Sequence, residues 1–265
     1  MPVGIREEGQ LKRRILYVAS PLLVLALWEL VARAGMIDVR FFPPPTKIFQ
    51  AMIDMAGRTD PLTGKIELWQ HLGASLSRIF WGSLLGFIPA VIIGLLMGLS
   101  PTLRAFLNPL VSVTYPIPKI AILPLLLLIF GLGEMSKIVV LAIGIFFLGL
   151  INTLQGVLQI PQIYFEVGHV YRVGWWRQFF LIVLPGAFPS IFTGLRLGVG
   201  YGLVLIVAAE FVGAKTGIGY LIWQSWEAFL VEDMYVGLIL ISLLGYLFNI
   251  FLERLEARFV PWSGK

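Results

Sequence analysis

The 265-residue chain contains no cysteine and few charged residues. Without cysteine it can form no disulfide bond and carry out no thiol chemistry. Charged residues make up 13% of the chain and hydrophobic residues 58%, whereas roughly a quarter of a soluble domain is charged. The composition therefore predicts an integral membrane protein. Its formal net charge of +5 is expected beside lipid headgroups rather than on nucleic acid.

The sequence also lacks the patterns that common catalytic and metal sites require. Its two histidines, His71 and His169, lie far apart and show no metal-ligand spacing. No phosphate-binding Gly-x-x-x-x-Gly-Lys-Ser/Thr segment occurs, since Gly64-Lys65 is followed by Ile66. An intramembrane hydrolase would need Ser/His or paired Asp residues within the spans, which the pattern does not offer. We therefore predict no catalytic residue and no metal site.

Six apolar runs divide the chain. They are 15–32, 79–99, 106–132, 138–157, 179–212 and 235–252. A helix of about 20 residues crosses the hydrocarbon core, and in lipid every backbone group must be satisfied internally. The runs therefore predict an all-α integral membrane protein with about six transmembrane helices. We expect a tail 1–14, a first helix 15–32, a loop 33–78, a core 79–256 and a tail 257–265.

The first run could be mistaken for a secretory signal. It follows Lys12-Arg13-Arg14 and ends at Ala32-Arg33-Ala34, which imitates a cleavage site. The run is longer than the usual signal core of about 7–15 residues, and an arginine between the alanines fits poorly. We therefore expect a retained first span.

Basic residues indicate the orientation. An even number of spans puts both termini on one side. Outside the loop 33–78 and the apolar runs, the basic residues are distributed ten to two in favour of that side. The positive-inside rule then places both termini in the cytoplasm and the loop outside the cell. Within the loop a Pro43-Pro44-Pro45 run predicts a stiff segment, and Thr46 is expected to cap a short helix that ends near Ala56.

The segment 166–185, EVGHVYRVGWWRQFFLIVLP, has mixed polarity and lies between two apolar runs. Its spacing resembles the loop signature of ABC-importer permeases, which reads Glu-Ala-Ala, three residues, Gly, nine residues, then Ile-x-Leu-Pro. Counted from Glu166, the end of that pattern falls on Ile182, Leu184 and Pro185. The chain departs from the family where Val167 and Gly168 replace the alanines and Arg172 replaces the glycine. Gly174, two residues later, is a candidate for that glycine's role.

Further segments extend the resemblance from about residue 72 to residue 262. They are 115–124, 130–134, 136–138, 146–147, 152–157, 194–197, 208–210 and 217–222. In this order they are similar to the nitrate/sulfonate/taurine branch of ABC-importer permeases, which also includes transporters of riboflavin and of pyrimidine precursors. The first seventy residues match only loosely.

The resemblance implies a type I ABC importer permease fold, in the bacterial inner membrane, with a cytoplasmic coupling helix. It implies a second permease copy in a homodimer, two cytoplasmic ABC ATPases that bind ATP and Mg²⁺, and an extracytoplasmic substrate-binding protein. The chain itself would hold no cofactor. The substrate would be a small anion such as a sulfonate, nitrate or bicarbonate, or a small heteroaromatic. The alternative is a gradient-driven secondary transporter or channel, which usually shows an internal repeat that is not visible here.

The region 160–175 predicts a short amphipathic helix, with Ile163, Val167 and Val170 on one face. From the pattern alone, this helix either lies among lipid headgroups or contacts a partner. The resemblance favours a coupling helix that rests on an ATPase. The ATPase-coupling residues that it implies are Glu166, Gly168, Arg172, Gly174, Leu184 and Pro185.

Lys119 falls inside an apolar run, where an ionisable group is costly. It follows Pro116 and Pro118, which interrupt a regular helix. One interpretation places Lys119 and Tyr115 in the translocation pathway, where the lysine lowers the barrier for an anion. The other gives its ammonium group the role of capping carbonyls freed by the broken helix.

Two further ionisable residues and several glycines also lie in apolar runs. Arg196 is expected in packing or an ion pair. Glu210 either lines the translocation pathway near its outer gate or pairs with a basic group such as Lys215. The Gly-x-x-x-Gly pairs permit close helix contact, within a subunit or between copies; they are Gly82 with Gly86, Gly94 with Gly98, and Gly194 with Gly198.

The orientation can be tested with single cysteines, because the chain has none of its own. We predict that Thr59→Cys reacts with a membrane-impermeant thiol reagent in intact cells and that Gln162→Cys reacts only after the membrane is opened. The opposite pattern of labelling would invert the topology.

Overall fold

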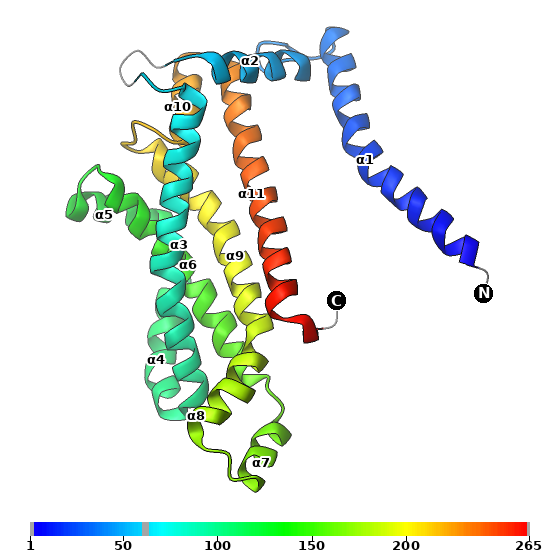
Figure 1. The fold of residues 1–265 in the computed structure, drawn as a ribbon. Coiled ribbons are helices and arrows are strands. Elements are labelled where there is room, and N and C mark those ends of the chain that lie inside the picture. The colour runs from blue at the N-terminus through cyan, green and yellow to red at the C-terminus, as the bar shows by residue number, and fades with distance from the viewer. Residues whose placement is uncertain (1–2, 60–63, 264–265) are drawn as a thin grey trace. The chain divides into compact units, whose positions relative to one another are not determined.

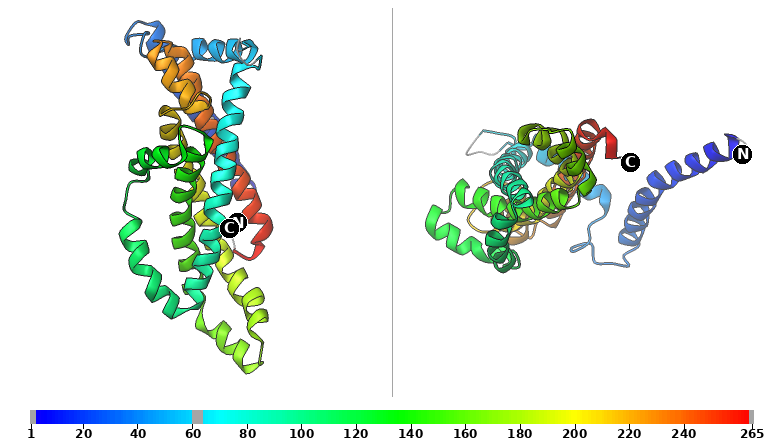
Figure 2. Two further views of the ribbon diagram at one scale, coloured as in Figure 1. Left: turned by 90° about the vertical axis from the view of Figure 1, so that its left-hand side faces the viewer. Right: turned by 90° about the horizontal axis from the view of Figure 1, so that it is seen from below.

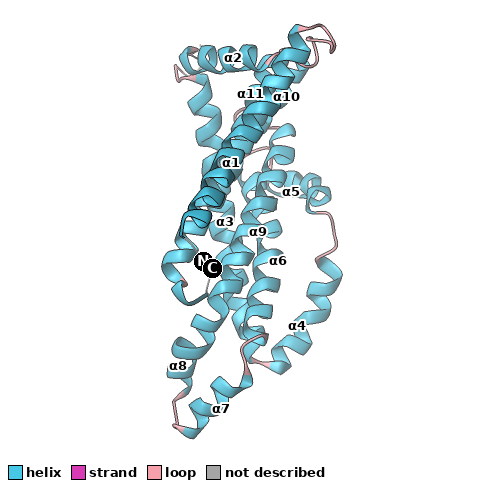
Figure 3. Ribbon diagram, turned by 90° about the vertical axis from the view of Figure 1, so that its right-hand side faces the viewer, coloured by secondary structure: helices cyan, strands magenta, loops and turns pink. Residues whose placement is uncertain are grey.

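The computed structural model describes residues 3–59 and 64–263. Of residues 3–15, 17, 18 and 263 it describes the backbone alone. The expected tails 1–14 and 257–265 therefore lie partly outside the described residues. Every regular element across the described ranges is helical (Figure 3). The helices (Figure 1) are α1 (Val3–Arg33), α2 (Pro45–Gly57), α3 (Glu67–Leu99), α4 (Pro101–Thr114), α5 (Leu123–Phe130), α6 (Glu134–Leu158), α7 (Gln162–Val170), α8 (Trp175–Gln178), α9 (Leu184–Phe211), α10 (Ile218–Glu227) and α11 (Val231–Phe259).

Four helical stretches of the described chain are long and apolar enough to cross a membrane. They are α3, α6, the stretch Trp175–Phe211 and α11, and α4 with Lys119–Phe130 adds a fifth if that bent pair counts as one span. The bend is 84° and falls at Pro116 and Pro118, which cannot continue a regular helix. The expected count of about six is therefore met only roughly. The run 15–32 is helical within α1 but is not among these stretches.

The chain forms two compact units. The first comprises residues 1–69 and 221–238, and the second comprises 70–220 and 239–265. In the first unit, Glu29 of α1 accepts hydrogen bonds from the amide (3.0 Å) and hydroxyl (2.8 Å) of Thr46. Arg58 pairs with Asp233 at 3.2 Å. The expected cap at Thr46 is wrong, because Pro45 has a φ suited to the first turn and starts α2 one residue earlier.

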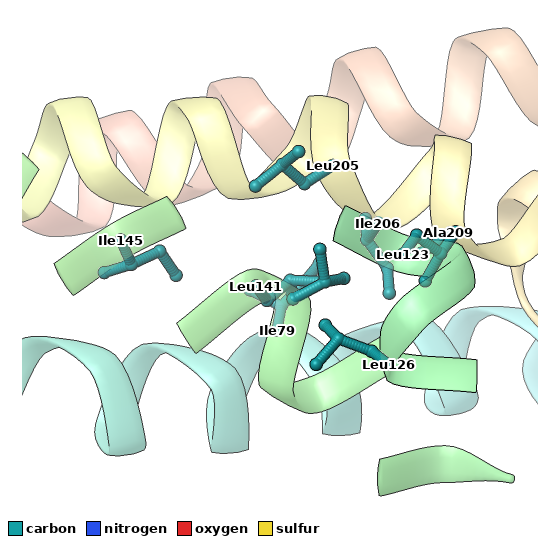
Figure 4. Close-up of a cluster of buried hydrophobic side chains, with 9 residues drawn as sticks. Ile79, Leu123, Leu126, Leu141, Ile145, Leu205, Ile206 and Ala209 are labelled. Carbon is teal, nitrogen blue, oxygen red and sulfur yellow. The ribbon is translucent and has the colours of Figure 1, made fainter. Parts of the chain in front are cut away.

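The second unit is built around α6, which α3 and α9 follow side by side (Figures 1 and 2). Between these helices Leu141 and Ile145 of α6 pack with Ile79 of α3 and Leu205 of α9 (Figure 4). The cluster also takes in Leu126 of α5, so the segment after the 84° bend belongs to the same core.

Glycines allow this close packing. All six members of the Gly-x-x-x-Gly pairs face α6. A Cβ atom at Gly98 would lie 2.5 Å from Val157 Cβ, and one at Gly194 would lie 2.8 Å from Asn152 Cβ. The other four glycines are Gly82, Gly86, Gly94 and Gly198. Lipid gives apolar side chains little reason to associate, so close van der Waals contact must hold such helices together. These pairs therefore serve packing within the subunit.

Gly86 gives the sharpest test of this packing, because an added Cβ would collide with the backbone carbonyl of Ala142, which cannot move aside. We predict that Gly86→Ala destabilises the purified permease by about 1–3 kcal/mol. The measurement is thermal unfolding in detergent. The matched control is Gly200→Ala on α9, where a Cβ meets nothing within 4 Å. Equal melting temperatures for the two variants would contradict the packing described here.

Candidate functional site

The short amphipathic helix predicted in the region 160–175 is present as α7, which lies between the end of α6 and the start of α8 and α9 (Figure 1). Its role as a coupling helix stays a prediction. Its apolar stripe faces outward, since the exposed fractions of Ile163, Val167 and Val170 are 57%, 47% and 79%. Tyr164 is also exposed, and so is Glu166. An apolar face that the subunit itself does not cover is typical of a contact surface.

The C-terminus of α7 explains the position where the resemblance has glycine. The Val173 amide donates to the Gly168 carbonyl at 2.8 Å, and the Arg172 amide donates to the His169 carbonyl at 3.0 Å. This pair of bonds closes a helix through a left-handed residue, which is normally glycine. Arg172 occupies that place with a φ of 53°. Gly174 has an ordinary φ of −64°, so the expectation that it takes over the glycine's role is wrong.

Gly168 and Gln178 position α7 against the following segment. Gly168 is buried, and a Cβ atom there would lie 3.1 Å from Gln178 Nε2. That amide nitrogen donates to the Val173 carbonyl at 3.2 Å. Sequence reasoning missed Gln178, because nothing in the local pattern marks it as a contact of α7.

Leu184 and Pro185 begin α9. Proline has no amide hydrogen and cannot bond the carbonyl four residues earlier, that of Leu181. The chain takes a single π-helical turn, Phe179–Val183, immediately before this point. A π turn of this kind accommodates the lost bond within the continuous helical stretch Trp175–Phe211.

Lys119 lies at the bend between α4 and α5, with 3% of its surface exposed. Its ammonium group donates to the carbonyls of Thr114 (2.7 Å), Tyr115 (3.0 Å) and Ile117 (2.9 Å). An ammonium group has three donors, so all are used. Lys119 therefore caps the broken helix, and the expectation of a pathway cation that meets the substrate directly must be corrected.

A cavity of about 300 Å³ lies beside this bend. Its walls come from the bend, from α6 and from α9; the lining residues are Tyr115, Pro116, Ile117, Pro118, Lys119, Gly144, Phe147, Leu148 and Tyr201. Lys119 and Tyr115, which the sequence pointed to together, thus line one cavity, and their place in the translocation pathway stays a prediction. Tyr201 was missed, since a tyrosine in an apolar run gives no distinct signal.

Glu210 lies at the opposite end of α9 from α7 and has no exposed surface. Its carboxylate accepts hydrogen bonds from Arg78 Nη1 (2.6 Å), Ser75 Oγ (2.8 Å) and the Gly219 amide (2.7 Å). Arg78 also binds Glu134 at 2.5 Å. These bonds join α3, α6, α9 and the start of α10. Glu210 therefore does not line an open pathway, and the basic partner that the structure gives it is Arg78.

The arginine of the apolar run 179–212 forms an ion pair, as expected. Arg196 of α9 forms an ion pair with Glu256, which is 7% exposed at its side chain, near the C-terminal end of α11. The pair ties the last long helix to α9. Substrate contact is not needed to explain this arginine.

Comparison with known proteins identifies the chain. Residues 90–262 match the family described as binding-protein-dependent transport system inner membrane component. The chain belongs to this family. It is 32% identical to the taurine transport system permease protein TauC of Escherichia coli (strain K12), over 94% of this chain and 90% of that protein. It is 32% identical to the bicarbonate transport system permease protein CmpB of Synechococcus elongatus, over 98% of this chain and 92% of that protein.

Solved structures agree on the fold. The chain matches a chain of the inward-facing MetNI methionine ABC transporter with a TM-score of 0.62 and 20% identity, over 76% of this chain and 99% of that chain. The protein is a multi-pass, all-helical permease subunit of an ABC importer. The alternatives of a gradient-driven transporter and of an intramembrane hydrolase are thereby set aside.

The left-handed Arg172 predicts a stabilising substitution. A left-handed conformation costs an L-residue about 1–2 kcal/mol. Glycine avoids this cost but loses more backbone entropy on folding, so the net gain is smaller. We predict that Arg172→Gly stabilises the end of α7 by about 0.5 kcal/mol and slows amide hydrogen exchange at Val173. Gly174→Ala, at an ordinary φ in open space, is the control and should leave exchange unchanged. Faster exchange in Arg172→Gly would show that the arginine side chain holds the turn.

Removing each of the two carboxylates that bind Arg78 should reduce the stability of the permease by very different amounts. Glu210→Gln should destabilise the purified permease by about 3 kcal/mol, because it leaves a buried guanidinium without its buried partner. Glu134→Gln removes a carboxylate whose side chain is 62% exposed and should cost less than about 1 kcal/mol. Thermal unfolding measures both. Equal losses would mean that burial does not distinguish the two pairs.

Proposed function

We propose that two copies of this chain form the translocation pathway of an ATP-driven importer and that each copy binds one cytoplasmic ABC ATPase through α7. The observation that carries the proposal is the exposed apolar face of α7 at Ile163, Val167 and Val170. The chain has no phosphate-binding loop, so ATP and Mg²⁺ bind to the ATPases. Closure of the ATPases moves α7, and the Gly168–Gln178 contact and the π turn carry that movement into α9.

Membership of the family supports the rest of the proposed assembly. A soluble binding protein outside the cell delivers the solute, membrane lipid surrounds the helices, and nucleic acid plays no part. Both termini lie in the cytoplasm, in agreement with the ten-to-two distribution of basic residues. One chain carries one set of permease helices, which supports a homodimer.

The solute is a small oxyanion or a small neutral heteroaromatic. Relatives at about 32% identity are named for taurine and bicarbonate, and a putative permease of Bacillus subtilis (strain 168) for aliphatic sulfonates at 31% identity. All three names refer to small molecules that carry an acidic oxygen group. This favours an oxyanion for the present chain.

The docking of α7 can be tested with charge substitutions on its exposed face. We predict that Val170→Asp and Glu166→Lys each reduce co-purification of the ATPase at least tenfold or uncouple ATP hydrolysis from transport, because a buried, mispaired charge at an interface is costly. Both side chains are exposed in the subunit, so the permease itself should remain folded.

The matched control is Glu253→Lys, at an exposed glutamate on α11. It makes the same change of charge away from α7 and should leave the complex intact. Normal assembly and transport by both α7 variants would show that α7 lies among lipid headgroups and contacts no ATPase.

A further inference from the structure

We propose that the cavity beside Lys119 is a subsite for a small oxyanion, in which the hydroxyl groups of Tyr115 and Tyr201 contact the anion and Lys119 supplies the positive charge from behind. The inference rests on the proposed transport function and names the chemistry that the pathway selects. It assigns contact and charge to different residues, because Lys119 cannot meet the solute with its own donors.

The cavity has an aromatic wall that the backbone makes room for. Tyr115 comes from the bend, Phe147 from α6 and Tyr201 from α9. Gly144 allows the approach of Tyr201, since a Cβ at that position would lie 3.2 Å from Tyr201 Cε1. The rings of Tyr115 and Phe147 are 6.2 Å apart between centroids. Three segments far apart in the sequence thus converge on a space of about 300 Å³.

Lys119 gives this space a positive potential. Three carbonyl dipoles satisfy its N–H groups, but dipoles do not cancel a unit charge. Among the described residues no carboxylate pairs with Lys119, and the cavity lining contains no acidic side chain. The ammonium nitrogen also lies over the Phe147 ring, 4.3 Å from its centroid, in a cation–π contact that stabilises the charge without neutralising it. In surroundings of low dielectric such a charge acts over a longer range than in water.

The tyrosines supply the directional contacts. Tyr115 is 45% exposed and Tyr201 is 36% exposed, so both rings reach accessible space. A phenol hydroxyl donates one hydrogen bond, and a bond to an anionic oxygen is stronger than one between neutral groups. Two such donors in a positive cavity match the acceptor oxygens of a sulfonate, nitrate or bicarbonate ion.

Placing the charge behind the wall suits transport. A pathway site must attract the solute enough to let it enter but bind it weakly enough to let it leave. A lysine in direct contact would form a strong ion pair, whereas a charge held by carbonyls contributes only its field. The aromatic wall alone would also suit a neutral heteroaromatic ring, but the positive charge of Lys119, which no described carboxylate neutralises, favours the oxyanion.

The test measures binding to the purified permease–ATPase complex in nanodiscs, without the binding protein. Isothermal titration is carried out with ethanesulfonate, nitrate and bicarbonate, and with uracil as a neutral heteroaromatic. We expect at least one oxyanion to bind in the millimolar range and uracil not to bind. Tyr115→Phe and Tyr201→Phe keep the rings and should each weaken oxyanion binding about tenfold. Tyr246→Phe, at an exposed tyrosine on α11, is the control and should change nothing.

Three results would overturn the subsite: binding of uracil without any oxyanion, no binding of any probe, or unchanged oxyanion affinity in both tyrosine variants. Lys119→Met adds a check, with weaker oxyanion binding expected in whatever fraction assembles. Failure of the subsite is distinguishable from failure of the proposed function. If the ATPase co-purifies with the permease and responds to its binding protein while the tyrosine variants bind normally, only the subsite is wrong.

Discussion

The close approach of α3 and α9 to α6 is the constraint on which the rest of the second unit depends. Lipid offers no hydrophobic gain when apolar helices meet, so contact must come from backbones that approach closely. Glycines such as Gly86 and Gly194 provide that approach. At the far end of α9 the buried ion pair of Arg78 and Glu210 also joins the helices. The Glu210 carboxylate accepts further hydrogen bonds from the Ser75 hydroxyl and from the Gly219 amide.

The proposed docking face on α7 and the proposed subsite beside Lys119 both lie next to α9. The exposed face of α7 lies at one end of α9, and the cavity beside Lys119 lies along the same helix, at Tyr201. The chain runs from α7 to α9 through the short non-helical link 171–174, α8 and the π turn at Phe179–Val183. Rigid helices that share close contacts have few ways to deform, so a movement at one end has to be accommodated at the other.

Much of the fold could be predicted from the sequence, because hydropathy and proline are local signals. Four long apolar runs became helical stretches long enough to cross a membrane, and Pro116 with Pro118 marked the bend between α4 and α5. The partners of buried charges could not be predicted, since 132 residues separate Arg78 from Glu210 and nothing local pairs them. The role of Arg172 was also hidden, because a left-handed φ is a property of the folded backbone.

The most direct test of the account is a site-specific crosslink from α7. A cysteine-reactive photocrosslinker is placed at Val170→Cys in the otherwise cysteine-free chain, in membranes that contain the whole transporter. We predict a crosslink to the ATPase whose yield changes when ATP binds. The same label at Leu243→Cys, an exposed position on α11, should give none. Labelling of lipid alone from position 170 would contradict the claim that α7 couples the permease to an ATPase.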